Sequence, residues 1–138
     1  MESAIRKASV LIEALSYVRS FRDKITVIKL GGSAMEDPEA VAATLQDVVF
    51  METVGMRPVL VHGGGKAIDR AMSKAGLVPT KVAGRRYTDD ATLKIVVDTL
   101  LNEINAGLVK QIQQLGGQAV PVHTGGLQVL HGRKLAMA

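Results

Sequence analysis

The chain contains no cysteine. This excludes disulfide cross-links and thiolate metal sites, and it is typical of proteins of a reducing compartment. No apolar run approaches the ~18 residues that a bilayer-spanning helix needs, and residues 1–24 lack the apolar core of a signal peptide. We therefore expect a cytoplasmic protein with no membrane association.

Aromatic residues are also scarce, at 3% of the chain with no tryptophan. Proteins that bind single-stranded nucleic acid use aromatic side chains as stacking platforms. The net charge of +4 comes from 17 lysines and arginines that are spread along the chain without a dense cluster. We expect no nucleic-acid partner, and interpret the charge as that of a mildly basic protein with small anionic ligands.

What is present is an ordinary globular composition, with 47% hydrophobic and 22% charged residues in 138. Residues 4–21 carry apolar side chains at helical spacing, and Ser3 is a plausible cap of that helix. We expect residues 1–24 to form an N-terminal amphipathic helix and residues 25–138 to form one domain.

Strands and helices alternate along that domain. The patterns predict strands at 25–30, 58–61 and 118–122, and helices at 38–53, 66–75 and from 90 to a stop at 116–117. Residues 77–87 are expected to be irregular, and 127–137 to form a short hairpin. This order favours a three-layer α/β/α sandwich with a mainly parallel sheet, in which ligands bind at the carboxyl ends of the strands.

Two of the predicted strands end in glycines. The first carries Lys29 to its end and opens into Gly31 and Gly32, and the second opens into Gly63–Gly65. Glycines let backbone N–H groups approach a ligand closely, and the helix that follows the second strand points its N-terminus at an anion. The pattern predicts a site for phosphate or carboxylate groups.

Individual side chains leave alternatives open. Lys29 is either a solvated lysine or an ammonium group that neutralises charge on a transferring phosphoryl group. Arg86 is either a solvated loop residue or a guanidinium that captures a carboxylate. Asn105 either holds a ligand or bonds a neighbouring loop, and His62 is expected to orient its loop or to pack rather than to act as a general base.

Familiar phosphate motifs do not fit. Lys66 is followed by Ala67, where a P-loop needs serine or threonine, and Ile68 occupies the last glycine position of a dinucleotide-binding fingerprint that starts at Gly63. No spacing of histidine, aspartate or glutamate suggests a metal cage, so Mg²⁺ is expected to arrive with a nucleotide.

Four segments in order carry a resemblance to a known family. They are Ile28–Met35, Val61–Gly65, Gly84–Asp89 and the stretch from Asn105 to Val109. In content, order and spacing they resemble the acetylglutamate kinases, a branch of the amino acid kinase family. The resemblance implies phosphorylation of the γ-carboxylate of N-acetyl-L-glutamate by ATP with Mg²⁺, a step of arginine biosynthesis.

The resemblance also implies roles for individual residues. Lys29 would stabilise the transition state, and Gly31 and Gly32 would touch the ATP phosphates. The residues that would bind the acetylated amino acid are Gly64, Gly65, Arg86 and Asn105. No protein metal ligand is implied.

The N-terminal helix resembles the extension of arginine-regulated members, which implies a homo-oligomer (a dimer, or a hexamer built through that helix) and L-arginine as an inhibitor. The alternative is a helix that packs on its own domain. The resemblance covers only the amino-acid-binding half of the family, so we expect these 138 residues to lack its nucleotide-binding lobe, and residues 122–127 lack the aspartate usual there. We therefore expect the isolated chain to be weakly active or inactive. The alternatives are a non-catalytic acylamino-acid-binding module and a kinase of another acidic amino acid.

Overall fold

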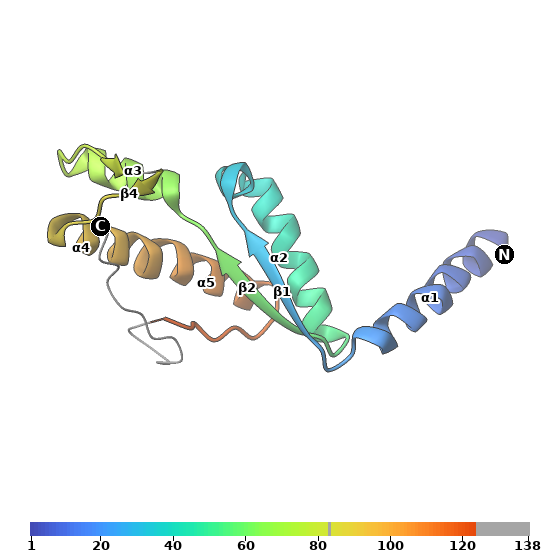
Figure 1. The fold of residues 1–138 in the computed structure, drawn as a ribbon. Coiled ribbons are helices and arrows are strands. Elements are labelled where there is room, and N and C mark those ends of the chain that lie inside the picture. Colours follow the sequence, from blue (N-terminus) through green and yellow to red (C-terminus); the bar gives the residue numbers. More distant parts are fainter. Residues whose placement is uncertain (83, 124–138) are drawn as a thin grey trace. The chain divides into compact units, whose positions relative to one another are not determined.

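A computed structural model describes residues 1–82 and 84–123 and shows a mixed α/β chain with a parallel strand pair (Figure 1). The chain divides into two compact units. Of the described residues, the first comprises Met1–Gly63 with Leu115–Gly117, and the second comprises those from Gly64 to Gln114 together with 118–123. The predicted division at residue 24 stays a prediction.

The first unit is built around two parallel strands. Its elements are α1 (Glu2–Phe21), β1 (Ile25–Leu30), the 3₁₀ helix η1 (Gly32–Glu36), α2 (Pro38–Thr53) and β2 (Arg57–His62). Ile25 lies opposite Arg57, and Leu30 opposite His62. Both strands were predicted, and their β-branched and apolar residues suit a pleated surface.

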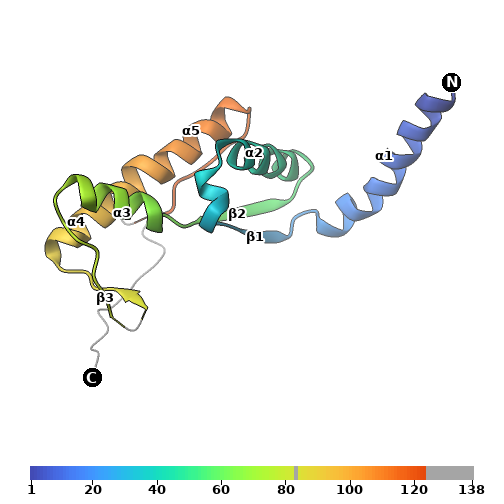
Figure 2. The ribbon, with the colours of Figure 1, turned by 90° about the horizontal axis from the view of Figure 1, so that it is seen from above.

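Helix α2 lies alongside these strands (Figures 1 and 2). Asp37 caps it, since its Oδ1 accepts from the N–H groups of Glu39 and Ala40, and Pro38 occupies the first helical position. These features confirm the predicted helix. The buried residues of the pair of strands and α2 are Leu30, Val41, Leu45 and Val48.

Helix α1 differs from the prediction at its start. It begins at Glu2, so Ser3 lies within the first turn and makes no cap; the N-cap position is Met1, which has no side-chain cap hydrogen bond. No residue of α1 is buried. Whether α1 joins copies of the chain or packs on its own domain stays a prediction.

The second unit contains α3 (Gly65–Lys74), β3 (Lys81–Val82), β4 (Arg85–Arg86), α4 (Asp90–Asp98), the π-helix η2 (Thr99–Asn105) and α5 (Ala106–Gln114). Helix α3 was predicted, and it buries Ala67, Ile68 and Met72. The expectation that 77–87 is irregular is wrong in part. Strands β3 and β4 form a short antiparallel pair, and Gly84 lies between them with φ of +76°.

The predicted helix from residue 90 is present, but it changes type. Segments α4, η2 and α5 follow one another from Asp90 to Gln114, and the middle segment has π-helical hydrogen bonding. Gly116, with φ of +87°, follows the end of α5 as expected. π-helical turns often mark functional positions, and here the segment ends on Asn105.

The strand predicted at 118–122 is absent. In the described part of the chain, β1 and β2 pair only with each other, and residues 118–122 adopt neither helix nor strand. Pro121 has no N–H group to donate to a neighbouring strand, and Val120 is exposed. The hairpin predicted at 127–137 lies outside the described residues.

Candidate functional site

The glycine-rich ends of β1 and β2 lie side by side in the first unit. The Gly63 N–H donates to the Leu30 carbonyl over 2.9 Å. A methyl group on Gly63 would lie 3.7 Å from the Gly31 Cα. Parallel pairing thus brings Gly31 and Gly63 together at one edge of the strand pair, where neither residue has a side chain to cover its backbone.

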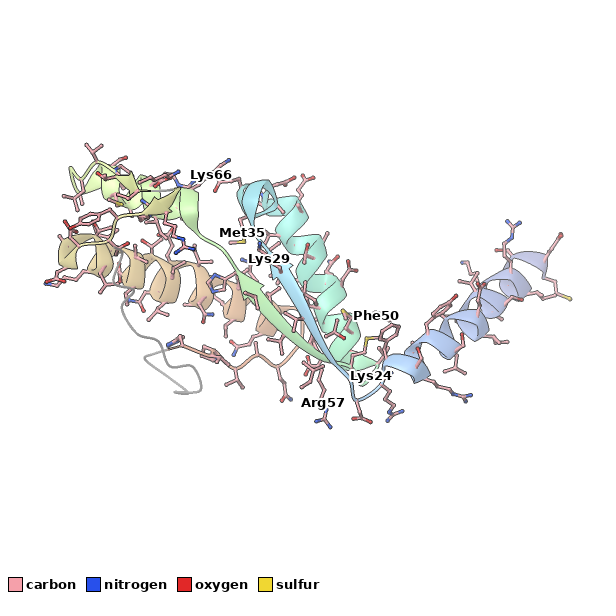
Figure 3. All side chains as sticks on the ribbon, in the orientation of Figure 1. Lys24, Lys29, Met35, Phe50, Arg57 and Lys66 are labelled. Carbon is pink, nitrogen blue, oxygen red and sulfur yellow. The ribbon has the colours of Figure 1, made fainter. Side chains whose placement is uncertain are left out.

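Lys29 lies at this edge. It is paired in register with Val61, and its side chain is exposed. A methyl group on Gly31 would lie 4.0 Å from the Lys29 Cε, so the lysine side chain runs beside Gly31. Figure 3 shows Lys29 near the carboxyl end of β1. The arrangement places a positive charge next to bare backbone, which suits phosphate oxygens.

Gly32 has a conformational reason to be glycine. Its φ of +63° is in the left-handed region, and it is the first residue of η1. His62, on the neighbouring strand end, places its Nδ1 3.2 Å from the Gly63 carbonyl oxygen. This contact lies within its own loop, as expected for a residue that orients the loop.

Gly64 and Gly65 belong to the second unit, and their surroundings differ. A methyl group on Gly64 would lie 2.6 Å from the Leu100 Cδ2 and 2.7 Å from the Ile104 Cδ1, both in η2. A methyl group on Gly65 would meet nothing within 4 Å. Gly64 is thus required for close packing against η2, whereas Gly65 opens α3 with free space beside it.

Arg86 extends from β4 to α3. Its Nη2 donates to Asp69 Oδ1 in an ion pair and lies 3.4 Å from the Gly65 carbonyl oxygen, while Nη1 lies 3.1 Å from the Met72 sulfur. The Arg86 side chain is 16% exposed and that of Asp69 is 43% exposed. The guanidinium is therefore held against the first turns of α3, and is not the solvated loop residue considered above.

The motif around Arg86 also starts α4. The Thr88 hydroxyl donates to the Arg86 carbonyl, and Asp89 Oδ1 accepts from the Thr92 N–H over 2.8 Å. The hydrogen bonds from Thr92 lower the pKa of Asp89 below its ordinary value. Asp89 therefore serves as a helix cap that fixes the chain after Arg86.

Asn105 is the last residue of η2 and is half-buried, with its Oδ1 buried. The predicted residues thus fall into two groups. Lys29, Gly31 and Gly32 gather at the β1–β2 edge of the first unit. The four residues predicted to bind the amino acid all belong to the second unit. They are Gly64, Gly65, Arg86 and Asn105.

Asp69 was not singled out from the sequence. Its partner is 17 residues away on another element, and no local pattern relates the two. No group of three metal-ligating side chains occurs in residues 1–82 and 84–123. None of the helices described combines the length and apolar character that a bilayer crossing requires.

Several acetylglutamate kinases are similar to this chain. That of Akkermansia muciniphila is 43% identical over 131 residues, and that of Methanocaldococcus jannaschii is 48% identical over 120 residues. These alignments cover 95% and 87% of this chain, but 43% and 40% of the relatives. The chain thus spans less than half the length of these curated relatives.

Solved structures show the same fold. The smu.665 protein of Streptococcus mutans superposes with a TM-score of 0.59 at 31% identity, over 68% of this chain and 37% of that one. The N-acetylglutamate synthase of Neisseria gonorrhoeae gives a TM-score of 0.63 at 21% identity, over 78% of this chain and 25% of the synthase.

The sequence also matches the amino acid kinase family over residues 24–136. This match begins at β1 and includes both glycine-rich strand ends and the Arg86 segment. It covers most of the chain. The chain therefore belongs to the amino acid kinase family.

Proposed function

We propose that the protein takes part in phosphorylation of the γ-carboxylate of N-acetyl-L-glutamate by ATP, a step of arginine biosynthesis. The observation that carries the proposal is the lysine at the β1–β2 edge, whose side chain runs beside the bare backbone of Gly31. Membership of the amino acid kinase family and the similarity to acetylglutamate kinases support it.

In this reaction a γ-carboxylate oxygen attacks the γ-phosphorus of ATP. The bond to the β,γ-bridging oxygen breaks, and ADP leaves with the electron pair. Charge builds up on the transferred phosphoryl group and on the leaving oxygen, so a positioned cation lowers the barrier. We assign that role to Lys29, and contact with the ATP phosphates to the backbone at Gly31 and Gly32.

Mg²⁺ would accompany ATP, because the ion prefers phosphate oxygens and water to an all-protein cage. Its role would be to neutralise charge on the phosphates. The bare backbone at Gly31 and the adjacent ammonium group of Lys29 suit the phosphate oxygens of such a complex. No carboxylate of the described chain is assigned to the ion.

For the acetylated amino acid we propose Gly64, Gly65, Arg86 and Asn105. The guanidinium of Arg86 would hold the α-carboxylate, and the open space beside Gly65 allows a ligand to approach the start of α3. We further propose a cytoplasmic location, a homo-oligomer joined through α1, and L-arginine as an inhibitor.

Titration calorimetry with N-acetyl-L-glutamate and with MgATP tests the proposal. We expect N-acetylglutamate to bind. Arg86→Ala should weaken this binding by about 10-fold or more, because the variant loses a charge-assisted hydrogen bond to the ligand. Lys29→Met should weaken MgATP binding. Lys24→Met is the control, because it removes an equal charge from the same unit at the other end of β1, and it should leave MgATP binding unchanged (Figure 3).

No binding of N-acetylglutamate would overturn the proposal. Stronger binding of an aspartate or aminoadipate derivative would assign the site to a different acidic amino acid. Binding of N-acetylglutamate without any binding of MgATP would indicate a non-catalytic acylamino-acid module. An ADP-release assay on the 138-residue chain should show little or no turnover, because these residues span less than half the length of the acetylglutamate kinases that they resemble.

A further inference from the structure

The guanidinium that we propose as the carboxylate site already holds a carboxylate of its own chain. Nη2 of Arg86 donates to Asp69 Oδ1 and faces the Gly65 carbonyl oxygen at 3.4 Å. Nη1 faces the Met72 sulfur at 3.1 Å. All three acceptors belong to α3. An incoming ligand therefore meets an arginine that is paired, not a vacant one.

The shape of a guanidinium limits what such a ligand can do. A carboxylate binds bidentately through two parallel N–H groups on one edge of the plane. The edges that offer such a pair are Nη1 with Nη2, and Nε with Nη2. Both include Nη2, which is the nitrogen engaged by Asp69 and Gly65. Nη2 has two N–H groups, one for each edge, and both Asp69 and the Gly65 carbonyl accept from this nitrogen. A ligand carboxylate can take an edge in full only by displacing one of these acceptors, and the Gly65 carbonyl is fixed in the backbone of α3 whereas the Asp69 side chain can rotate.

The exposed fractions of the two side chains indicate which of them can leave the ion pair. The Arg86 side chain is 16% exposed, whereas that of Asp69 is 43% exposed. Asp69 can turn into water at little cost. Arg86 cannot, because its side chain is mostly buried and a guanidinium there is destabilised when it has no anionic partner. The partner that replaces Asp69 must therefore carry a negative charge.

We propose that Asp69 is a specificity-determining residue of the Arg86 site: a ligand carboxylate binds Arg86 by displacing the Asp69 carboxylate from Nη2. The exchange admits carboxylate ligands and discriminates against neutral analogues, which cannot replace the lost ion pair. It lowers the affinity for the ligand, since only the fraction of molecules with Asp69 displaced is competent to bind. The assignment of the ligand as N-acetylglutamate rests on the function proposed above.

Calorimetric titration of Asp69→Asn and Asp69→Ala against the unsubstituted protein tests the exchange. Both variants remove the competing charge, and the asparagine keeps the shape of the side chain. We expect N-acetyl-L-glutamate to bind about 3- to 10-fold more tightly to each, because an ion pair of this exposure is worth about 1 kcal/mol. The α-amide of N-acetylglutamate should show no such gain, since it lacks the α-carboxylate that is proposed to bind Arg86.

Asp98→Asn is the matched control. It removes one negative charge from the same unit, at a residue whose Oδ1 accepts from Asn102 and not from Arg86. Unchanged or weaker binding of N-acetylglutamate to the Asp69 variants, or an equal gain in Asp98→Asn, would overturn the exchange and leave the proposed function standing.

Glutarate serves as a second probe in the same titrations. It carries two carboxylates, so it tests the exchange at Arg86 whether or not N-acetylglutamate is the substrate. If N-acetylglutamate binds no variant, the proposed function fails. The exchange is then still supported if glutarate binds the Asp69 variants more tightly than the unsubstituted protein and Asp98→Asn. If glutarate shows no difference, the exchange fails as well.

Discussion

Adjacent residues of the same type have different physical roles in this chain. Gly64 packs so closely against Leu100 and Ile104 that a methyl group would fall within 2.7 Å of each. Gly65 faces open space. The family resemblance assigns both to ligand binding, but the local structure gives only Gly64 a packing role of its own. Substitution separates the two contributions.

Gly64→Ala should destabilise the protein by about 1–2 kcal/mol, because the methyl group overpacks the contact with η2. Gly65→Ala should leave the stability unchanged or slightly higher, since alanine is the better helix former in α3. The same Gly65→Ala variant should weaken N-acetylglutamate binding if the ligand approaches the start of α3. Urea unfolding and calorimetry measure the two effects. Equal stability of the two variants would contradict the packing role of Gly64.

At the scale of elements, Asp89 links the Arg86 segment to α4. It accepts hydrogen bonds from Thr92, which lower its pKa in the folded state. An aspartate with a depressed folded pKa stabilises the fold above its unfolded pKa, about 3.9. That contribution is lost as the pH falls through the lower folded value. The cap thus makes part of the stability depend on pH in the acid range.

Asp89→Asn should make the unfolding free energy less dependent on pH in the acid range below the ordinary pKa of aspartate, because asparagine caps a helix without titrating. Near neutral pH the change should be small. Urea unfolding at a series of pH values measures it. Asp90→Asn removes a neighbouring carboxylate without removing the cap, and an equal flattening in that variant would contradict the assignment to Asp89.

The elements that local signals specify were predicted correctly. Helix α2 has its Asp37 cap and Pro38, and β1 and β2 have apolar runs that end in glycine. The β3–β4 pair was missed because two-residue strands carry no periodicity. The π-helical turn was missed too. Its apolar residues Leu100 and Ile104 continue to Leu108 and Ile112 at a spacing of four, which an ordinary α-helix also shows, so the sequence shows no sign of the change in helix type.

The candidate site was predictable from the sequence where it depends on strand pairing, and not where it depends on contacts between distant elements. Parallel pairing implies that Lys29 and both glycine runs share an edge, and the structure places Lys29, Gly31 and Gly63 there. The Arg86–Asp69 ion pair joins elements that are distant in sequence. Such contacts depend on how α3 packs against the β3–β4 pair, which no local pattern specifies.

At the scale of the whole molecule, α1 is notable for apolar side chains that no other part of its own unit buries. It has 20 residues, none of them buried. Its exposed large apolar side chains are those of Ile5, Val10, Leu11, Ile12, Leu15, Tyr17 and Phe21. A surface helix with so many exposed apolar side chains is typical of an interaction surface. Another copy of the same helix is the partner that the proposed homo-oligomer supplies.

The variant Leu11→Glu with Leu15→Glu should therefore reduce the assembly to a smaller species in sedimentation velocity experiments, because it places charges on adjacent turns of the apolar surface. The unfolding midpoint of the remaining fold should change little, since neither side chain is buried. Ser9→Glu with Ser20→Glu adds the same charge at two polar positions of the same helix and should leave the assembly intact. A monomeric unsubstituted protein, or equal dissociation in both double variants, would show that α1 does not join copies of this chain.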